Sequence, residues 1–151
     1  MRAGLSRARA DERGFTLIEV LVVVLIIGIL AAIAIPSFLS QKGKAVDASA
    51  KEMARAGAQA AETYSTDHSG EYGGIEATAL KEYEPVLQIT PSNKQAYLSA
   101  VESVEGGKGY TITAKSGNGD TFSYVKQGGS VSRTCEVSAS NPPSGCVSGT
   151  W

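Results

Sequence analysis

The chain has 151 residues and a mass of 15.7 kDa, enough for one modest domain and too little for two large ones. Its formal net charge is −1, and an excess of basic residues occurs only within the first 14 residues, where four arginines accompany two acidic residues. The acidic remainder lacks the electropositive composition that tight nucleic-acid binding requires, which argues against a DNA- or RNA-binding protein.

A long apolar segment, Phe15 to Leu39, follows the basic N-terminus. Within it, the 16 residues from Val20 to Ile35 have no charged or hydrogen-bonding side chain. A helix over 15–39 would be about 37 Å long, which exceeds a bilayer core of about 30 Å. The arginines before the segment and the acidic chain after it predict a cytoplasmic N-terminus and an external C-terminal part.

The order of the charged and apolar segments differs from that of a secretory signal peptide. In such a signal, the small residue at the cleavage site follows the apolar core. Here Gly14 stands before the apolar segment, directly after Arg13. A cut after Gly14 would therefore remove the arginines and leave the membrane anchor on the mature chain.

Glu19 is the acidic residue inside the apolar segment. A carboxylate at the bilayer centre costs about 2.5–3.5 kcal/mol, so acids in membrane helices are rare and usually functional. Glu19 lies only about 6 Å along the helix from Phe15, so an interfacial acid favoured by the helix dipole is the alternative. The residue taken alone does not decide between these two explanations.

The run Arg13-Gly14-Phe15-Thr16-Leu17-Ile18-Glu19, followed by about twenty apolar residues, resembles the class III leader of type IV pilins and pseudopilins. The resemblance is strongest over residues 7–55 and weaker beyond them. It implies that a prepilin peptidase cuts between Gly14 and Phe15 and methylates the new Phe15 amine. It also implies that Glu19 pairs with the Phe15 ammonium of a neighbouring subunit, because two buried opposite charges are tolerable only together.

Gly28 and Pro36 interrupt the same helix. Pro36 has no amide hydrogen and its ring crowds the carbonyl of Ala32, so a simple kink is one expectation. In the family that the leader resembles, the equivalent span loosens when subunits enter the fibre. We therefore also consider local melting from Gly28 to Pro36 on assembly.

Residues 40–65 are predicted to continue the helix as an amphipathic half. The side chains spaced three or four residues apart along one face are Val46, Ala50, Met53, Gly57, Ala60 and Tyr64. Small residues in this stripe would let a sheet pack closely against the helix. The alternative is that the helix forms a coiled coil. The expectation is one helix from Phe15 to about Ser65, with a transmembrane half at 15–39.

Residues 66–151 are expected to form the head. The stretch 66–95 has mixed signals and is predicted to be irregular, and Tyr97–Val104 fits a strand or a short helix. Clearer strands are predicted at 110–114 and 121–125 around the hairpin signal Gly117–Asp120, and at 130–137 after Gly128-Gly129. Three or four antiparallel strands packed on the amphipathic half give an α+β fold.

Cys135 and Cys146 lie near the C-terminus, on either side of the turn-forming run Asn141–Gly145. In an exported domain two such thiols are expected to form a disulfide, with free thiols in a cytosolic chain as the alternative. A short C-terminal loop closed by two cysteines also resembles the disulfide-bounded region of many type IV pilins. Trp151, the last residue, is expected to pack against the head rather than project from it.

No catalytic constellation, cofactor motif or metal site is evident in the sequence. His68 is the only histidine and has polar neighbours, and Gly106-Gly107-Lys108-Gly109 lacks the spacing of a phosphate-binding loop. Gly117–Asp120 lacks the spaced carboxylates of a calcium loop. The chain is therefore not expected to be an enzyme or to bind a cofactor.

The leading hypothesis is a structural subunit, the major pilin of a type IV pilus that serves adhesion, motility or DNA uptake. Its expected partners are other copies of itself, the prepilin peptidase, the assembly platform with its ATPase, and the membrane before assembly. The alternatives are a pseudopilin of a type II secretion system and a minor or competence pilin that binds DNA. A membrane-anchored domain that never polymerises is a further alternative.

Overall fold

The computed structural model describes residues 14–138 and 145–151. Its elements, in chain order, are α1 (Leu17–Asp67), α2 (Ala77–Tyr83), β1 (Tyr97–Val104), the 3₁₀ turn η1 (Glu105–Gly107), β2 (Gly109–Lys115), β3 (Thr121–Gln127) and β4 (Ser130–Glu136). The chain divides into two compact units, Met1–Ser37 and Phe38–Trp151, which are described separately. Except for Gly14, the expected leader lies outside the described residues.

Helix α1 begins and ends within two residues of the predicted positions, Phe15 and Ser65. At its start the Thr16 hydroxyl accepts a hydrogen bond from the Glu19 amide at 3.3 Å, which caps the first turn. At its end Gly70 has a φ of +85° and its N–H donates to the carbonyl of Ser65 at 2.7 Å. This left-handed turn closes the helix in the way that glycine favours.

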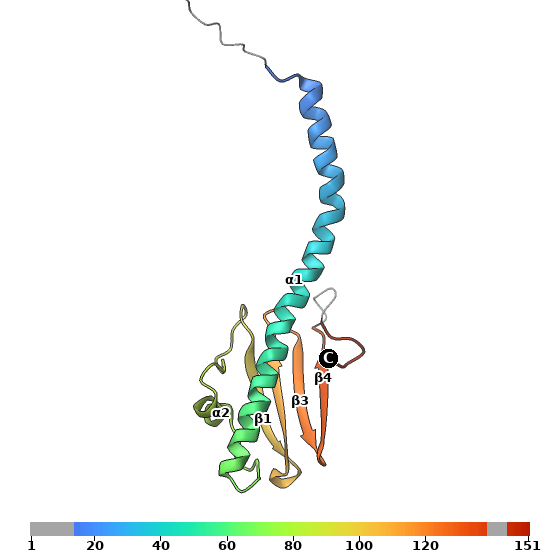
Figure 1. The fold of residues 1–151 in the computed structure, drawn as a ribbon. Coiled ribbons are helices and arrows are strands. Elements are labelled where there is room, and N and C mark those ends of the chain that lie inside the picture. The colour runs from blue at the N-terminus through green and yellow to red at the C-terminus, as the bar shows by residue number, and fades with distance from the viewer. Residues whose placement is uncertain (1–13, 139–144) are drawn as a thin grey trace, which may run out of the picture. The chain divides into compact units, whose positions relative to one another are not determined.

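The Phe38–Trp151 unit is a four-stranded antiparallel sheet with the second half of α1 across one face (Figure 1). The strands follow the order β1-β2-β3-β4, so β1 and β4 are the two edge strands. The predicted α+β fold, with a long helix on a small antiparallel sheet, is confirmed.

Small side chains form the contact between α1 and the sheet. The buried residues on α1 include Ala50, Ala54, Gly57, Ala58, Ala60, Ala61 and Tyr64. They meet the inner face of the sheet, whose buried side chains include Leu98, Tyr110, Ile112, Ala114 and Phe122. The predicted stripe is largely confirmed and is wider than expected, while Val46 and Met53 are only half-buried. Because the sheet of the same chain covers this stripe, the coiled-coil alternative is wrong.

Both predicted hairpin turns are confirmed. Strands β2 and β3 pair antiparallel around the turn at Gly117–Asp120, where Gly119 has a φ of +94°. Gly128 and Gly129 join β3 to β4, with φ values of +56° and +78°. Two consecutive positive φ angles match the twist of a tight hairpin, which is why two glycines occur here.

Strand β1 resolves the ambiguity of Tyr97–Val104 in favour of a strand. Its pairing with β2 shifts between Leu98 and Ala100, which is a β-bulge. The bulge puts Leu98 opposite Ala114 and Val101 opposite Ile112, although these two apolar residues are three positions apart. The spacing of the apolar residues in Tyr97–Val104 therefore matched neither the period of a strand nor that of a helix.

Helix α2 corrects the prediction that 66–95 is wholly irregular. It spans only seven residues, buries Leu80, and begins after Glu76, which makes no side-chain cap. The missing cap and the short length explain why the sequence pattern did not indicate it.

We predict that Gly57→Val destabilises the head. A Cβ at Gly57 would lie 2.9 Å from Ile112 Cγ2 and 3.3 Å from Leu98 Cδ2, so the larger side chain overpacks the contact between α1 and the sheet. The expected loss is about 1–3 kcal/mol in the free energy of unfolding, measured by thermal denaturation of the detergent-solubilised chain. Ala48→Val, at an exposed position on α1, is the matched control. An equal loss in both variants would contradict the packing argument.

Candidate assembly site

The expected cleavage position lies in exposed, non-helical chain. Gly14, Phe15 and Thr16 precede α1 and are all exposed, and Phe15 is 83% exposed. A peptidase must bind its substrate in extended form, so this geometry suits a cut between Gly14 and Phe15. The arginines expected to be removed lie outside the described residues.

Glu19 lies one helical turn after Phe15, and both line an open hollow of about 270 Å³ together with Val20 and Val23. In this uncut chain the Phe15 nitrogen is an amide, so the expected ion pair requires cleavage first. Thr16 and Glu19 also have the spacing of a capping box, a signal that the sequence analysis missed. Glu19 therefore belongs to the first turn of the helix, and its carboxylate is exposed.

The first half of α1 presents apolar side chains on every side. From Phe15 to Leu39, seventeen large apolar side chains are 45–83% exposed. Burial of each stabilises by about 1.5–3 kcal/mol, so leaving them in water would cost tens of kcal/mol. Among the described residues, α1 is the one helix long and apolar enough to cross a membrane. The segment requires lipid or other protein around it.

Gly28 and Pro36 both lie inside α1, which remains helical across them. Among the described residues, no side chain lies within 4 Å of the place where a Gly28 Cβ would be. The expected melting concerns the assembled fibre, so it stays a prediction.

A disulfide joins Cys135 at the end of β4 to Cys146, and the structure describes both cysteines although residues 139–144 lie outside it. The segment after Cys146 returns to the sheet, where the Cys135 amide donates to the Gly149 carbonyl at 2.9 Å. This bridge holds the C-terminal segment on the edge of the sheet.

Asp47 on α1 anchors the same segment, a role that the sequence analysis missed. Its side chain is fully buried, and its carboxylate accepts from the Gly145 amide at 2.8 Å and from the Asn118 side-chain amide at 3.2 Å. Lys51, one turn later, donates to the Gly145 carbonyl at 2.6 Å. The helix therefore holds the disulfide loop and the β2–β3 turn through polar groups brought together only by folding.

Trp151 packs against the head, as predicted. Its ring meets Phe122 edge-on at 6.0 Å, and its Nε1 donates to the Ser123 carbonyl at 3.3 Å. The guanidinium groups of Arg55 and Arg133 lie 5.3 and 5.5 Å from the centre of the same ring.

Glu62 on α1 is the centre of a second polar cluster. It accepts hydrogen bonds from Lys126 at 2.8 Å, Tyr72 at 2.8 Å and Tyr110 at 3.0 Å. Burial alone would raise the pKa of Glu62, but the hydrogen bonds from Lys126 and the two tyrosines lower it below its ordinary value. Burial and then the Glu62 charge raise the pKa of Tyr110. The cluster ties α1 to β2, β3 and the loop after the helix.

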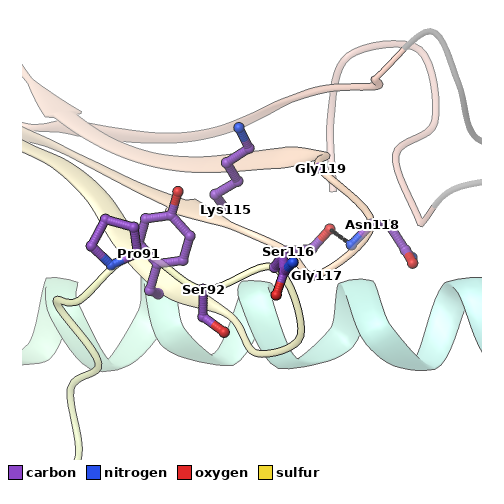
Figure 2. A pocket seen from close by; sticks show the side chains of 9 residues that line it. Pro91, Ser92, Lys115, Ser116, Gly117, Asn118 and Gly119 are labelled. Carbon is purple, nitrogen blue, oxygen red and sulfur yellow. Dashed lines mark hydrogen bonds between the residues drawn. The ribbon is translucent and has the colours of Figure 1, made fainter.

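An open basin of about 640 Å³ lies in the head beside the β2–β3 turn (Figure 2). Its lining includes Pro91, Ser92, Tyr97, Lys115 and Asn118 and contains no carboxylate. In the part of the chain that the structure describes, no three acidic, histidine or cysteine side chains are grouped to hold a metal ion. The basin therefore has polar groups for weak binding but no acid–base pair or nucleophile arrangement.

Comparison with known proteins finds similarity at the N-terminus and over most of the chain. Residues 9–35 match the model of the prokaryotic N-terminal methylation motif. The type II secretion system core protein G of Pseudomonas aeruginosa is 35% identical over 132 residues, covering 81% of this chain and 91% of that protein.

Two pilus proteins are also similar to the chain. The type IV major pilin protein PilA of Myxococcus xanthus is 50% identical over 52 residues, 34% of this chain and 24% of PilA. A fimbrial protein of Neisseria meningitidis is 29% identical over 115 residues, 76% of this chain and 61% of that protein. No solved structure matches the chain.

We predict that Glu62→Gln lowers the stability of the head at neutral pH. The pKa of Glu62 is lower in the folded chain than in the unfolded chain. Its negative charge therefore stabilises the folded state at pH values above the unfolded pKa, and this contribution is lost as the pH falls through the folded pKa. The expected loss in the free energy of unfolding near pH 7 is about 1 kcal/mol. It is no larger because the Glu62–Lys126 pair is partly exposed to water. Thermal unfolding between pH 7 and pH 3 should show the difference from wild type shrinking below about pH 4.

Glu52→Gln, at an exposed position ten residues earlier on α1, is the control and should change stability little at any pH. A constant difference between Glu62→Gln and wild type across the whole pH range would contradict the role of the Glu62 charge.

Proposed function

Because the chain belongs to the type IV pilin family, whose members are structural subunits and not enzymes, we propose that it is the major subunit of an extracellular type IV pilus. The observation that carries the proposal is the exposed apolar half of α1, directly behind the accessible Gly14–Phe15 junction. Such a helix suits a protein that is first a membrane precursor and then a fibre subunit.

The proposed processing divides the chain at the predicted boundaries. Residues 1–14 are the leader, 15–39 the membrane and fibre-core half of the helix, 40–65 its amphipathic half, and 66–151 the head. A prepilin peptidase removes the leader and methylates Phe15. The precursor sits in the cytoplasmic membrane with its N-terminus inside, and an assembly platform with its ATPase extracts it into the fibre.

In the proposed fibre, the apolar helices of many copies exchange lipid contacts for contacts with one another. Glu19 is the one acidic residue in the described part of this core, and its carboxylate pairs with the methylated Phe15 ammonium of a neighbour. Any arrangement that breaks the pair leaves a buried charge uncompensated, which costs about 3–5 kcal/mol. The pair therefore selects one register of the helices.

A fibre outside the cell is favoured by the construction of the C-terminal segment. The Cys135–Cys146 disulfide and the Asp47 anchor hold an exposed tail against the head. A disulfide of this kind stabilises by roughly 2–4 kcal/mol and forms in oxidising compartments. A surface fibre that serves adhesion, motility or DNA uptake needs such resistance to unfolding and proteolysis.

A pseudopilin of a type II secretion system is the second candidate. The similarity to the Pseudomonas core protein G supports it, because that similarity extends over 91% of the relative, whereas the similarity to the Myxococcus pilin covers only 24% of that pilin.

Removal of the Glu19 charge should prevent fibre formation. We expect Glu19→Gln to lower the yield of sheared fibres at least about tenfold, because the Phe15 ammonium then lacks its partner. Glutamine can still serve in a capping box, so the helix start is preserved. Thr16→Ala is the matched control, since it removes the cap and keeps the carboxylate. Wild-type fibre yield from Glu19→Gln would contradict the assembly role.

The two candidate systems differ in where the protein is found. For a pilus, normally expressed protein should appear in fibres sheared from the cell surface, and deletion of the gene should remove those fibres without stopping export of soluble proteins. The opposite result, with no surface fibres and a loss of protein export on deletion, would favour the pseudopilin.

A further inference from the structure

A basic groove lies between α1 and strands β2, β3 and β4 of the head. The groove has a volume of about 250 Å³ and is lined by Arg55, Gln59, Glu62, Tyr110, Tyr124 and Arg133. Arg133 on β4 lies opposite Tyr124 on β3, so both side chains project from the same face of the sheet. Its walls combine aromatic rings and guanidinium groups, a composition typical of interfaces.

The two arginines of this groove lack an acidic partner among the described residues. Their contacts there are with the ring of Trp151, at 5.3 Å from Arg55 and 5.5 Å from Arg133. The carboxylate in the lining, Glu62, is already bonded to Lys126 and two tyrosine hydroxyls. Two exposed guanidinium groups beside one ring favour a carboxylate between or beside them, because arginine binds carboxylates with two parallel hydrogen bonds.

The opposite edge of the head is acidic. Helix α2 contacts β1, the edge strand farthest from β4, and Figure 1 shows the two edges on either side of α1. The acidic residues on α2 and next to its ends are Glu76, Glu82 and Glu84, which we term the acidic edge. Within 71–84 the basic residue is Lys81, whose amine donates to the Leu87 carbonyl at 2.9 Å.

Arg133 on β4 and the acidic edge beside β1 lie on opposite edges of one head. Four strands about 4.8 Å apart separate the two edge strands by about 14 Å. A two-fold dimer through either surface alone would bring like charges together. A contact between the groove of one copy and the acidic edge of the next pairs opposite charges, and such a head-to-tail contact forms an open helical polymer when the rotation between copies does not close into a ring.

We propose that the basic groove of one head, centred on Arg55 and Arg133, binds the acidic edge of the neighbouring copy, including Glu76 and Glu82. The inference rests on the proposed function, because it assumes that many heads are stacked in one fibre. The helices hold the fibre core together, and this charge contact sets which sides of adjacent heads face each other.

A charge exchange between the two surfaces tests the proposal in full-length protein expressed in the native cells. The variants are Arg55→Glu with Arg133→Glu, Glu76→Lys with Glu82→Lys, and all four changes together. Each pair of reversals should lower the yield of sheared fibres about tenfold, because like charges then meet at every contact. The fourfold variant should recover to within about twofold of wild type. Lys94→Glu with Lys108→Glu, at two exposed positions, lowers the net charge as much as the arginine reversals do and should not reduce the yield.

Yields are compared per amount of processed, disulfide-oxidised subunit in the membrane, so that folding losses are separated from assembly losses. If the glutamate variants do not accumulate, Arg55→Gln with Arg133→Gln should still lower the yield about threefold. Failure of the fourfold variant to recover would overturn the proposal and favour another anionic occupant, such as a polysaccharide. Unchanged yields in all variants would also overturn it. A wild-type chain that forms no fibres would instead refute the proposed function.

Discussion

The exposed apolar surface of the first half of α1 is the constraint on which the rest of the molecule depends. Seventeen large side chains of one helix are exposed in the part of the chain that the structure describes. Exposure of these side chains to water would cost tens of kcal/mol, so the helix requires lipid or other protein around it, and in the proposed fibre it passes from lipid to contacts with other copies. Lipid and protein offer nearly equal apolar contact, which is why one helix can serve both as an anchor and as a fibre core. In the proposed fibre, the carboxylate of Glu19 adds the specificity that apolar contact alone lacks.

The second half of α1 packs against the sheet of the head. Its alanines and Gly57 allow the sheet to approach closely. Polar side chains on the same helix add hydrogen bonds to other segments of the head. Asp47 and Lys51 hold the disulfide loop, and Glu62 holds the sheet through Lys126 and Tyr110. These bonds join segments far apart in the chain, so the head is fastened to the helix at several points along its length.

Local patterns predicted the helix, both glycine hairpins and the pairing of the two cysteines, since each depends on neighbouring residues or on simple spacing. Helix α2 was missed because it is short and uncapped, and the bulge in β1 concealed its alternation. The clusters around Asp47 and Glu62 have no sequence signal, because their partners come together only in the folded head. The capping box at Thr16 and Glu19 was recognisable from its spacing alone.

Processing and polymerisation are tested most directly by the intact mass and N-terminal sequence of the protein sheared from the surface of native cells. We expect filaments whose subunit begins at a methylated Phe15 and contains an oxidised cysteine pair. An uncut chain that begins at Met1 and occurs only in the membrane fraction would contradict it, and would leave an anchored domain that does not polymerise.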